Sequence, residues 1–234
     1  MMNSDTLDRE TAELVSAAFE KSWAFVATDP KLADDDMEAM RARFDQARAQ
    51  VDREEAIHEE LGLRWGVNMA VSHRWRIEML AGRPDAAEDA IRAGLEGGLL
   101  HRDDGTLVSF DLLLGIALLE QGRFSEARDV VERRGGVEGE ERQAHVMWCG
   151  IRARTSAEQG DLVEAERIAR DGVASVAGTD ELNTHAESLV HLGWVLRSAG
   201  DPDGAAGTVA EALELYGRKG NIAAATLVRS AFPG

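Results

Sequence analysis

The sequence has little cysteine, proline or aromatic content, and each shortage narrows the range of folds. Cys149 is the single cysteine of 234 residues, so an intramolecular disulfide framework is excluded and a reducing compartment is expected. The chain has only 4 prolines, and they lie at turns rather than inside the periodic segments. Aromatic residues make up 5% of the chain and hydrophobic residues 44%, rich in alanine and leucine, which suits stacked helices better than the core of a sheet.

Long apolar runs and a positive charge balance are also missing. No stretch approaches the ~18 consecutive apolar residues of a membrane-spanning helix, and the first residues lack the basic region and apolar run of a signal peptide. The 43 acidic and 26 basic side chains give a net charge of -17, which repels phosphate. We therefore expect a soluble, cytoplasmic protein that binds neither nucleic acid nor membrane. The acidic surface has two readings, solubility alone or a cationic partner.

The chain repeats a short motif at a nearly constant spacing. A glycine followed five residues later by an alanine occurs at Gly82, Gly122, Gly160 and Gly200, and a degenerate copy has Ala42 in the glycine position. A period of about 40 residues is typical of a solenoid of helix pairs. The glycine can adopt the left-handed conformation that ends one helix, and the alanine lets the next helix pack closely. The residues expected to start that second helix are Pro84, Ser125, Asp161 and Pro202.

Apolar periodicity predicts an all-α fold, a superhelical array of antiparallel helix pairs. The predicted helices span 66–81, 84–97, 106–121, 124–134, 142–159, 162–176, 182–199, 202–217 and 221–232, with an exposed loop at 134–141. The segment from about 34 to 62 is also helical in pattern, with a weaker bend where Ala42 replaces glycine. We expect residues 1–40 to form an N-terminal helical cap or a divergent first unit, and residues 41–234 to form the repeat domain.

Two of these units resemble the tetratricopeptide repeat. Leu192-Gly193, Gly200, Ala205 and Ala212-Leu213 stand at its main positions, and Leu114-Gly115 with Gly122 and Ala127 repeat the match. The period is longer than the usual ~34 residues of that family, and the Gly82 and Gly160 units replace the Leu-Gly pair. The resemblance implies a right-handed superhelix whose concave face, lined by the first helix of each pair, binds partners.

A narrower resemblance covers residue 40 to the end. Residues 43–48, 58–62 and 210–225 resemble the C-terminal repeat region of bacterial adenylate/guanylate cyclase-like ATPase regulators. Neither the cyclase nor the nucleotide-binding module of such regulators has a counterpart in these 234 residues. This resemblance implies a sensor or docking array.

Motifs of common catalytic and cofactor sites are missing from the sequence. It has no phosphate-binding loop, no Gly-x-Gly-x-x-Gly after a strand and no Gly-x-Ser-x-Gly elbow. His145 and Cys149 share a helix face that a metal ion could use, but two ligands do not complete a zinc site. Packing of a buried thiol beside a histidine is the preferred interpretation. We therefore predict a protein that is not an enzyme and has no cofactor and no metal ion.

The predicted binding site is the concave groove. Aligning the first helices on the turn glycines places apolar, charged and aromatic residues there, namely Ser72, Arg76, Leu112, Ile116, Arg154, Glu187, Trp194 and Arg197. Arginine and tryptophan concentrate binding energy at interfaces, and such a face suits a helix or an extended acidic peptide. For Trp194 the competing interpretation is packing between adjacent units.

The function predicted from this groove is a non-enzymatic protein-interaction or regulatory scaffold that binds a protein or peptide partner. Two alternatives remain open. The first is a small-molecule-sensing regulatory domain, which would have a closed pocket around Trp75, Trp148 and Trp194 in place of an open groove. The second is a homodimerisation module, since the terminal helices of a repeat stack invite partners.

Overall fold

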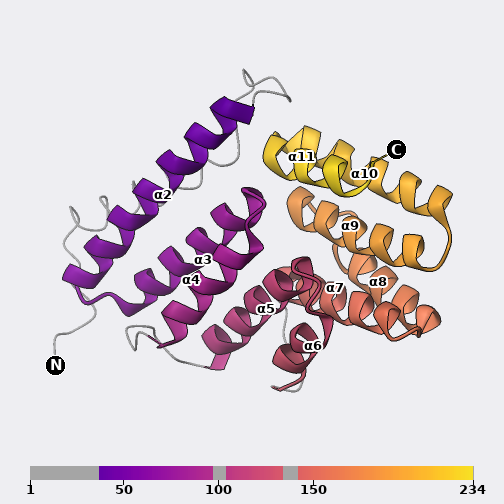
Figure 1. Cartoon of the computed structure of the whole chain (residues 1–234), viewed down its shortest axis with the longest axis horizontal. Coiled ribbons are helices and arrows are strands. Elements are labelled where there is room, and N and C mark those ends of the chain that lie inside the picture. The colour runs from indigo at the N-terminus through magenta and orange to yellow at the C-terminus, as the bar shows by residue number, and fades with distance from the viewer. Residues whose placement is uncertain (1–36, 97–103, 134–141, 234) are drawn as a thin grey trace.

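The computed structural model describes residues 37–96, 104–133 and 142–233, and within these ranges the chain forms ten α-helices and no strand (Figure 1). The helices are α2 (Met37–Glu60), α3 (Arg64–Leu80), α4 (Pro84–Glu96), α5 (Asp104–Glu120), α6 (Phe124–Glu132), α7 (Arg142–Glu158), α8 (Leu162–Val176), α9 (Leu182–Ser198), α10 (Pro202–Lys219) and α11 (Ile222–Ala231). The predicted all-α class is confirmed, and every predicted helix from residue 66 onward lies within two residues of its observed ends. None of these helices is long and apolar enough to cross a membrane.

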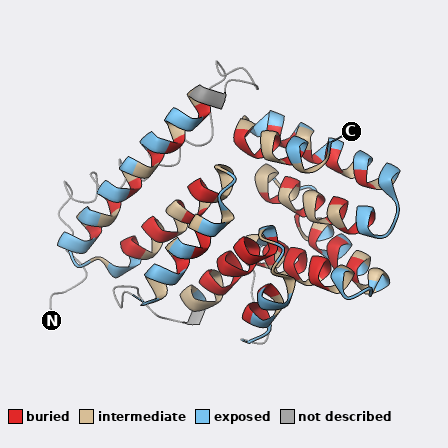
Figure 2. Cartoon of the chain, in the orientation of Figure 1, coloured by how far each residue is buried: buried red, intermediate tan, exposed pale blue. Residues whose placement is uncertain are grey.

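Four helix pairs, α3–α4, α5–α6, α7–α8 and α9–α10, form the repeated units. The turn glycines Gly82, Gly122, Gly160 and Gly200 have φ values of 70, 74, 86 and 79°, in the left-handed region that side chains disfavour. The motif therefore marks the turn inside each pair, as its spacing predicts. Buried residues follow the helix faces that meet neighbouring helices, and exposed residues follow the outer faces (Figure 2).

In two units an aspartate is the N-cap of the second helix. The Asp161 carboxylate accepts a hydrogen bond from the Glu164 backbone N–H at 3.2 Å, and Asp201 accepts one from Gly204 at 2.9 Å. The helix predicted from residue 124 does begin at Phe124, but Ser125 does not start it, because Arg123 occupies the capping position. The Arg123 side chain bonds Glu126 instead, at 2.7 and 2.6 Å.

The N-terminal part differs from the expected repeat. α2 is one continuous helix of 24 residues that passes through Ala42 without a turn, and the chain reverses only at Gly62, whose φ is 68°. Alanine lacks glycine's tolerance of positive φ, so the degenerate motif has no bend at all. The proposed boundary between residues 40 and 41 falls inside α2, whereas residues 1–36 and the loop at 134–141 lie outside the described residues.

The two ends of the array meet. Ala223 of α11 lies in one apolar cluster with Phe44 of α2 and Ile77 of α3, and α11 contacts α3 directly. Leu80 at the end of α3 packs against the apolar cluster formed by α9, α10 and α11. In Figure 1, α11 lies beside the end of α3, so the described helices run around a closed circuit. The last helix of the array therefore forms part of the wall of its concave face.

Candidate binding cavity on the concave face

Closure of the array leaves a cavity of about 490 Å³ on the concave face. Its walls come from the first helices of all four pairs, α3, α5, α7 and α9, together with α10 and α11. Apolar side chains dominate the lining, among them Met79, Leu80, Ile116, Met147, Val190 and Leu227. Helices far apart in sequence thus contribute to one mainly apolar site.

Trp194 of α9 holds a fixed position in the wall of this cavity. The Arg197 guanidinium lies 3.9 Å from the centre of its ring system and that of Arg154 lies 4.7 Å away, both within cation–π range. The Phe232 ring packs on it at 5.0 Å between centroids. Arg154 also donates to the Glu120 carboxylate, and Arg197 donates to the Ala231 carbonyl oxygen at 2.8 Å. Both guanidinium groups are therefore engaged within the protein.

An ion pair joins the first and last units across the cavity. The Arg76 guanidinium of α3 lies 3.4 Å from the Glu187 carboxylate of α9, and both side chains retain partial exposure. Tyr216 of α10 is in the same wall, where burial and the nearby Glu187 charge raise the pKa of its phenol well above the usual value. Neutral hydroxyl, carboxylate and guanidinium groups thus share one region of an otherwise apolar lining.

His191 is a neutral member of the wall. Burial and the Arg154 charge lower the pKa of its imidazole to about 3, so the ring carries no charge at physiological pH. Its Nδ1 is buried and has no hydrogen-bond partner among the described residues. The ring fits against Gly150 of α7, where an added Cβ would lie only 2.4 Å from a ring carbon.

The tetratricopeptide-repeat family model matches two segments, residues 108–133 and 149–171. The first contains the α5–α6 turn and the second the α7–α8 turn. The array is tetratricopeptide-like. The second match includes the Gly160 turn, although Arg152-Ala153 stands there in place of the Leu-Gly pair.

Solved structures with a similar arrangement include two proteins of low sequence identity to this tetratricopeptide-like chain. The crystal structure of YrrB, described as a TPR protein with an unusual peptide-binding site, has 15% identity and a TM-score of 0.40, with 91% of this chain and 97% of that chain covered. BtubC (BKLC) from P. vanneervenii has 17% identity and a TM-score of 0.44, with 92% of each chain covered. No curated protein matches the sequence significantly.

The structure places only some of the residues predicted for the groove of this tetratricopeptide-like array in the cavity wall. Arg76, Ile116, Glu187 and Trp194 line the cavity, and Arg154 and Arg197 support it through Trp194. Leu112 is 3% exposed within the core. The Ser72 hydroxyl donates to the Asn68 carbonyl oxygen at 2.9 Å and does not line the cavity. Binding of a partner by these eight residues stays a prediction.

Sequence reasoning missed the residues that the closure brings in. Tyr216 of α10 and Leu227 of α11 line the cavity, but the predicted groove used only the first helices and placed α11 at the end of the stack. His191 also lines it, from the first helix α9, and was not among the predicted groove residues. The small-molecule alternative expected a pocket around Trp75, Trp148 and Trp194. The observed cavity is lined by Trp75 and Trp194, whereas Trp148 packs elsewhere, with its ring centroid 6.3 Å from that of His145.

Proposed function

We propose that this chain is a non-enzymatic interaction and regulatory module whose ligand binds in the cavity on the concave face. The observation that carries the proposal is the convergence of helices from both ends of the array on one mainly apolar cavity. Solenoids present their concave faces to ligands, and about 490 Å³ falls within the ~300–1,000 Å³ typical of ligand pockets.

The chemistry of the lining favours a compact ligand with an apolar body. Ile116, Met147 and Val190 offer dispersion contacts, and the Arg76–Glu187 pair offers one donor and one acceptor at its edge. Each of these charges already has a partner, so a strongly acidic peptide would gain less than an apolar segment with one polar end. The preferred partner is a short apolar segment of another protein.

The closure by α11 favours a second candidate, a small-molecule sensor. Because α11 packs on α3, a ligand in the cavity contacts both ends of the array at once. Binding would stabilise the contact between α11 and α3, and a linked effector domain could respond to that stabilisation. The resemblance to cyclase-like ATPase regulators supports such a role for a sensor array.

A paired substitution tests the site. Val190→Phe adds a ring inside the cavity, whereas Val163→Phe makes the same change on α8, where the side chain is 84% exposed. Peptide and metabolite libraries would be screened by thermal shift against both variants and the wild type. A ligand at 100 times its Kd stabilises by ~2.7 kcal/mol, which raises the Tm of a chain of this size by roughly 5–10 °C.

The proposal expects this shift to survive in Val163→Phe and to be lost in Val190→Phe. Peptide hits would support the interaction module, and metabolite hits the sensor. Equal shifts in both variants would place the ligand elsewhere, and turnover of a bound compound would contradict the non-enzymatic assignment.

A further inference from the structure

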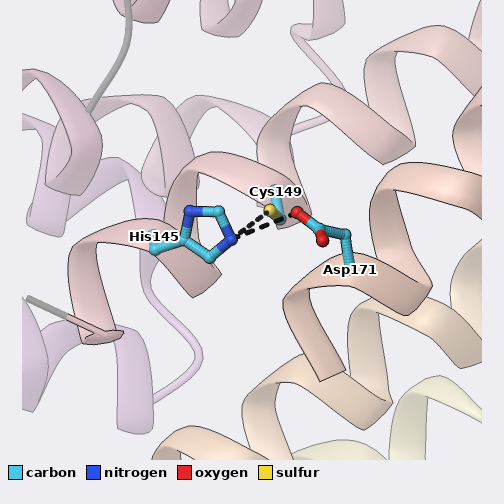
Figure 3. Close-up of side chains that lie close together, drawn as sticks. All are labelled: His145, Cys149 and Asp171. Atoms are coloured by element: carbon cyan, nitrogen blue, oxygen red, sulfur yellow. Dashed lines mark hydrogen bonds and ion pairs between the residues drawn. The ribbon is translucent and has the colours of Figure 1, made fainter. Parts of the chain in front are cut away.

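Three side chains with metal-ligating groups converge outside the cavity, between α7 and α8. His145 and Cys149 stand one helical turn apart on α7, and Asp171 reaches toward them from α8 (Figure 3). The His145 Nε2 lies 3.4 Å from the Cys149 Sγ and 3.3 Å from an Asp171 carboxylate oxygen. All three ligand atoms lie within 4.8 Å of one another.

These separations match the edges of a tetrahedral metal site. Zinc bonds of about 2.3 Å to sulfur and 2.0–2.2 Å to nitrogen or oxygen, at tetrahedral angles, place sulfur and nitrogen ligands about 3.5 Å apart. The same bonds place nitrogen and oxygen ligands about 3.3 Å apart. The observed distances of 3.4 and 3.3 Å therefore match two edges of such a site, and the third pair, the Cys149 Sγ and an Asp171 oxygen, lies within 4.8 Å.

Hydrogen bonds alone satisfy this group poorly. The Nε2 atom of a neutral imidazole carries either a proton or a lone pair. If it carries the proton, it can donate to Asp171, and the thiol proton then has no acceptor on the imidazole. If it carries the lone pair, it can accept from Cys149, and then two acceptors, Nε2 and the carboxylate, face each other. A cation would satisfy all three atoms together.

The surroundings keep the ligands in place and leave a route from solvent. Cys149 is 1% exposed, whereas the side chains of His145 and Asp171 are 31% and 60% exposed, so water can occupy a fourth position. Gly172 lets α8 approach closely, since a Cβ added there would lie 3.0 Å from that of Cys149. The Trp148 ring stacks on the imidazole with an interplanar angle of 25°.

The charges nearby are compatible with a divalent cation. Two arginines act on the thiol electrostatically, Arg152 and Arg167. The Arg167 guanidinium bonds both oxygens of Glu164 at 2.7 Å, and the Arg152 guanidinium lies over the Trp148 ring at 5.1 Å. A thiolate and a carboxylate together would neutralise the two positive charges of the ion.

We propose that Cys149, His145 and Asp171 form a binding site for a zinc-type divalent ion, with water as the fourth ligand. Thiolate and imidazole ligands select borderline ions such as Zn²⁺ or Co²⁺ over Mg²⁺ or Ca²⁺. Binding forms the metal–sulfur bond and releases the thiol proton to solvent. Burial and the Asp171 charge raise the pKa of the metal-free thiol to about 12, so a role as a free nucleophile is disfavoured. The ion would clamp α7 to α8.

Cobalt provides the test, because Co²⁺ reports its own coordination. Titration of the full chain with Co²⁺ should give a sulfur-to-cobalt charge-transfer absorption and the intense visible bands of four-coordinate cobalt. The bands should saturate at one ion per chain and disappear on addition of Zn²⁺. Cys149→Ser should abolish the charge-transfer band, with circular dichroism confirming that the variant remains folded.

Asp171→Asn is the decisive variant, because the Asp171 side chain is 60% exposed and its replacement leaves the core packing unchanged. Loss of one ligand should weaken binding by at least the 10–100-fold seen for losses of outer-shell partners. Asp203→Asn, an exposed aspartate on α10, is the matched control and should bind as the wild type does. A titration without the charge-transfer band, or an Asp171→Asn protein with wild-type affinity, would overturn the proposal.

Discussion

A glycine inside α7 offers a test of how tightly the cavity wall is packed. At Gly150 an added Cβ would lie 2.4, 2.5 and 2.7 Å from Cδ2, Nε2 and Cγ of His191, so the whole ring is in the way. At Gly207, in the exposed face of α10, an added Cβ meets nothing within 4 Å. The same substitution, glycine to alanine, is thus placed in two helices with opposite surroundings.

The expected free energies have opposite signs. Alanine stabilises a helix interior relative to glycine by ~0.5–1 kcal/mol, and Gly207→Ala should show this gain undiminished. At Gly150 the gain is offset by overpacking, which typically costs ~1–3 kcal/mol. We therefore expect Gly150→Ala to lower the free energy of unfolding by roughly 0.5–2 kcal/mol.

Urea denaturation followed by circular dichroism measures both values. The double variant Gly150→Ala/His191→Ala identifies the cause, because removal of the ring should relieve the overpacking and give a coupling energy of about 1 kcal/mol or more. If Gly150→Ala were as stable as Gly207→Ala, the ring would not fill the space that the structure gives it.

Three further predictions concern acidity, helix capping and closure. The pKa of His191 is lowered to about 3 in the folded protein. Below pH ~6.5 this imidazole is therefore protonated in the unfolded chain but stays neutral in the native state. Stability should fall by ~2 kcal/mol between pH 7 and 5, and an equally large fall in His191→Gln, by urea denaturation at both pH values, would contradict this. Asp201→Ala removes a helix cap and should cost ~1 kcal/mol, whereas Ser125→Ala should change thermal stability by less than about 0.5 kcal/mol. Ala223→Glu places a charge between α11, α2 and α3 and should speed amide hydrogen exchange in all three helices; the exposed control Ala206→Glu should not.

The helix pairs were predictable because their signals are local. A turn glycine and the helix start after it act within a few residues, so the positions of Gly122 and Gly160 suffice to place a turn. At Ala42 the helical segment was predicted correctly, but the weaker bend expected from the repeat spacing is missing, because alanine disfavours the left-handed conformation. The spacing of the motif follows the repeat, whereas the backbone conformation at each position depends on the residue present there.

The binding cavity was only half predictable, for a different reason. Arg76 and Trp194 follow from the register of the first helices, but the contact of α11 with α3 joins residues about 150 positions apart. No periodicity within a helix reports on which distant helix will cover it. The third metal-type ligand was missed in the same way, since Asp171 approaches Cys149 from another helix.

Glycines inside helices are the sequence signal that would have recovered part of this information. Each one costs its helix ~1 kcal/mol relative to alanine, so a close tertiary contact is the physical reason to look for. Gly150 and Gly172 carry that meaning here, since one makes room for the His191 ring and the other for Cys149. Gly207 lies inside a helix too and meets nothing within 4 Å, so a helical glycine marks a position to test for a close contact, and the presence and identity of the approaching residue come only from the fold. In this chain both residues that approach lie at the sites on which the proposed functions depend.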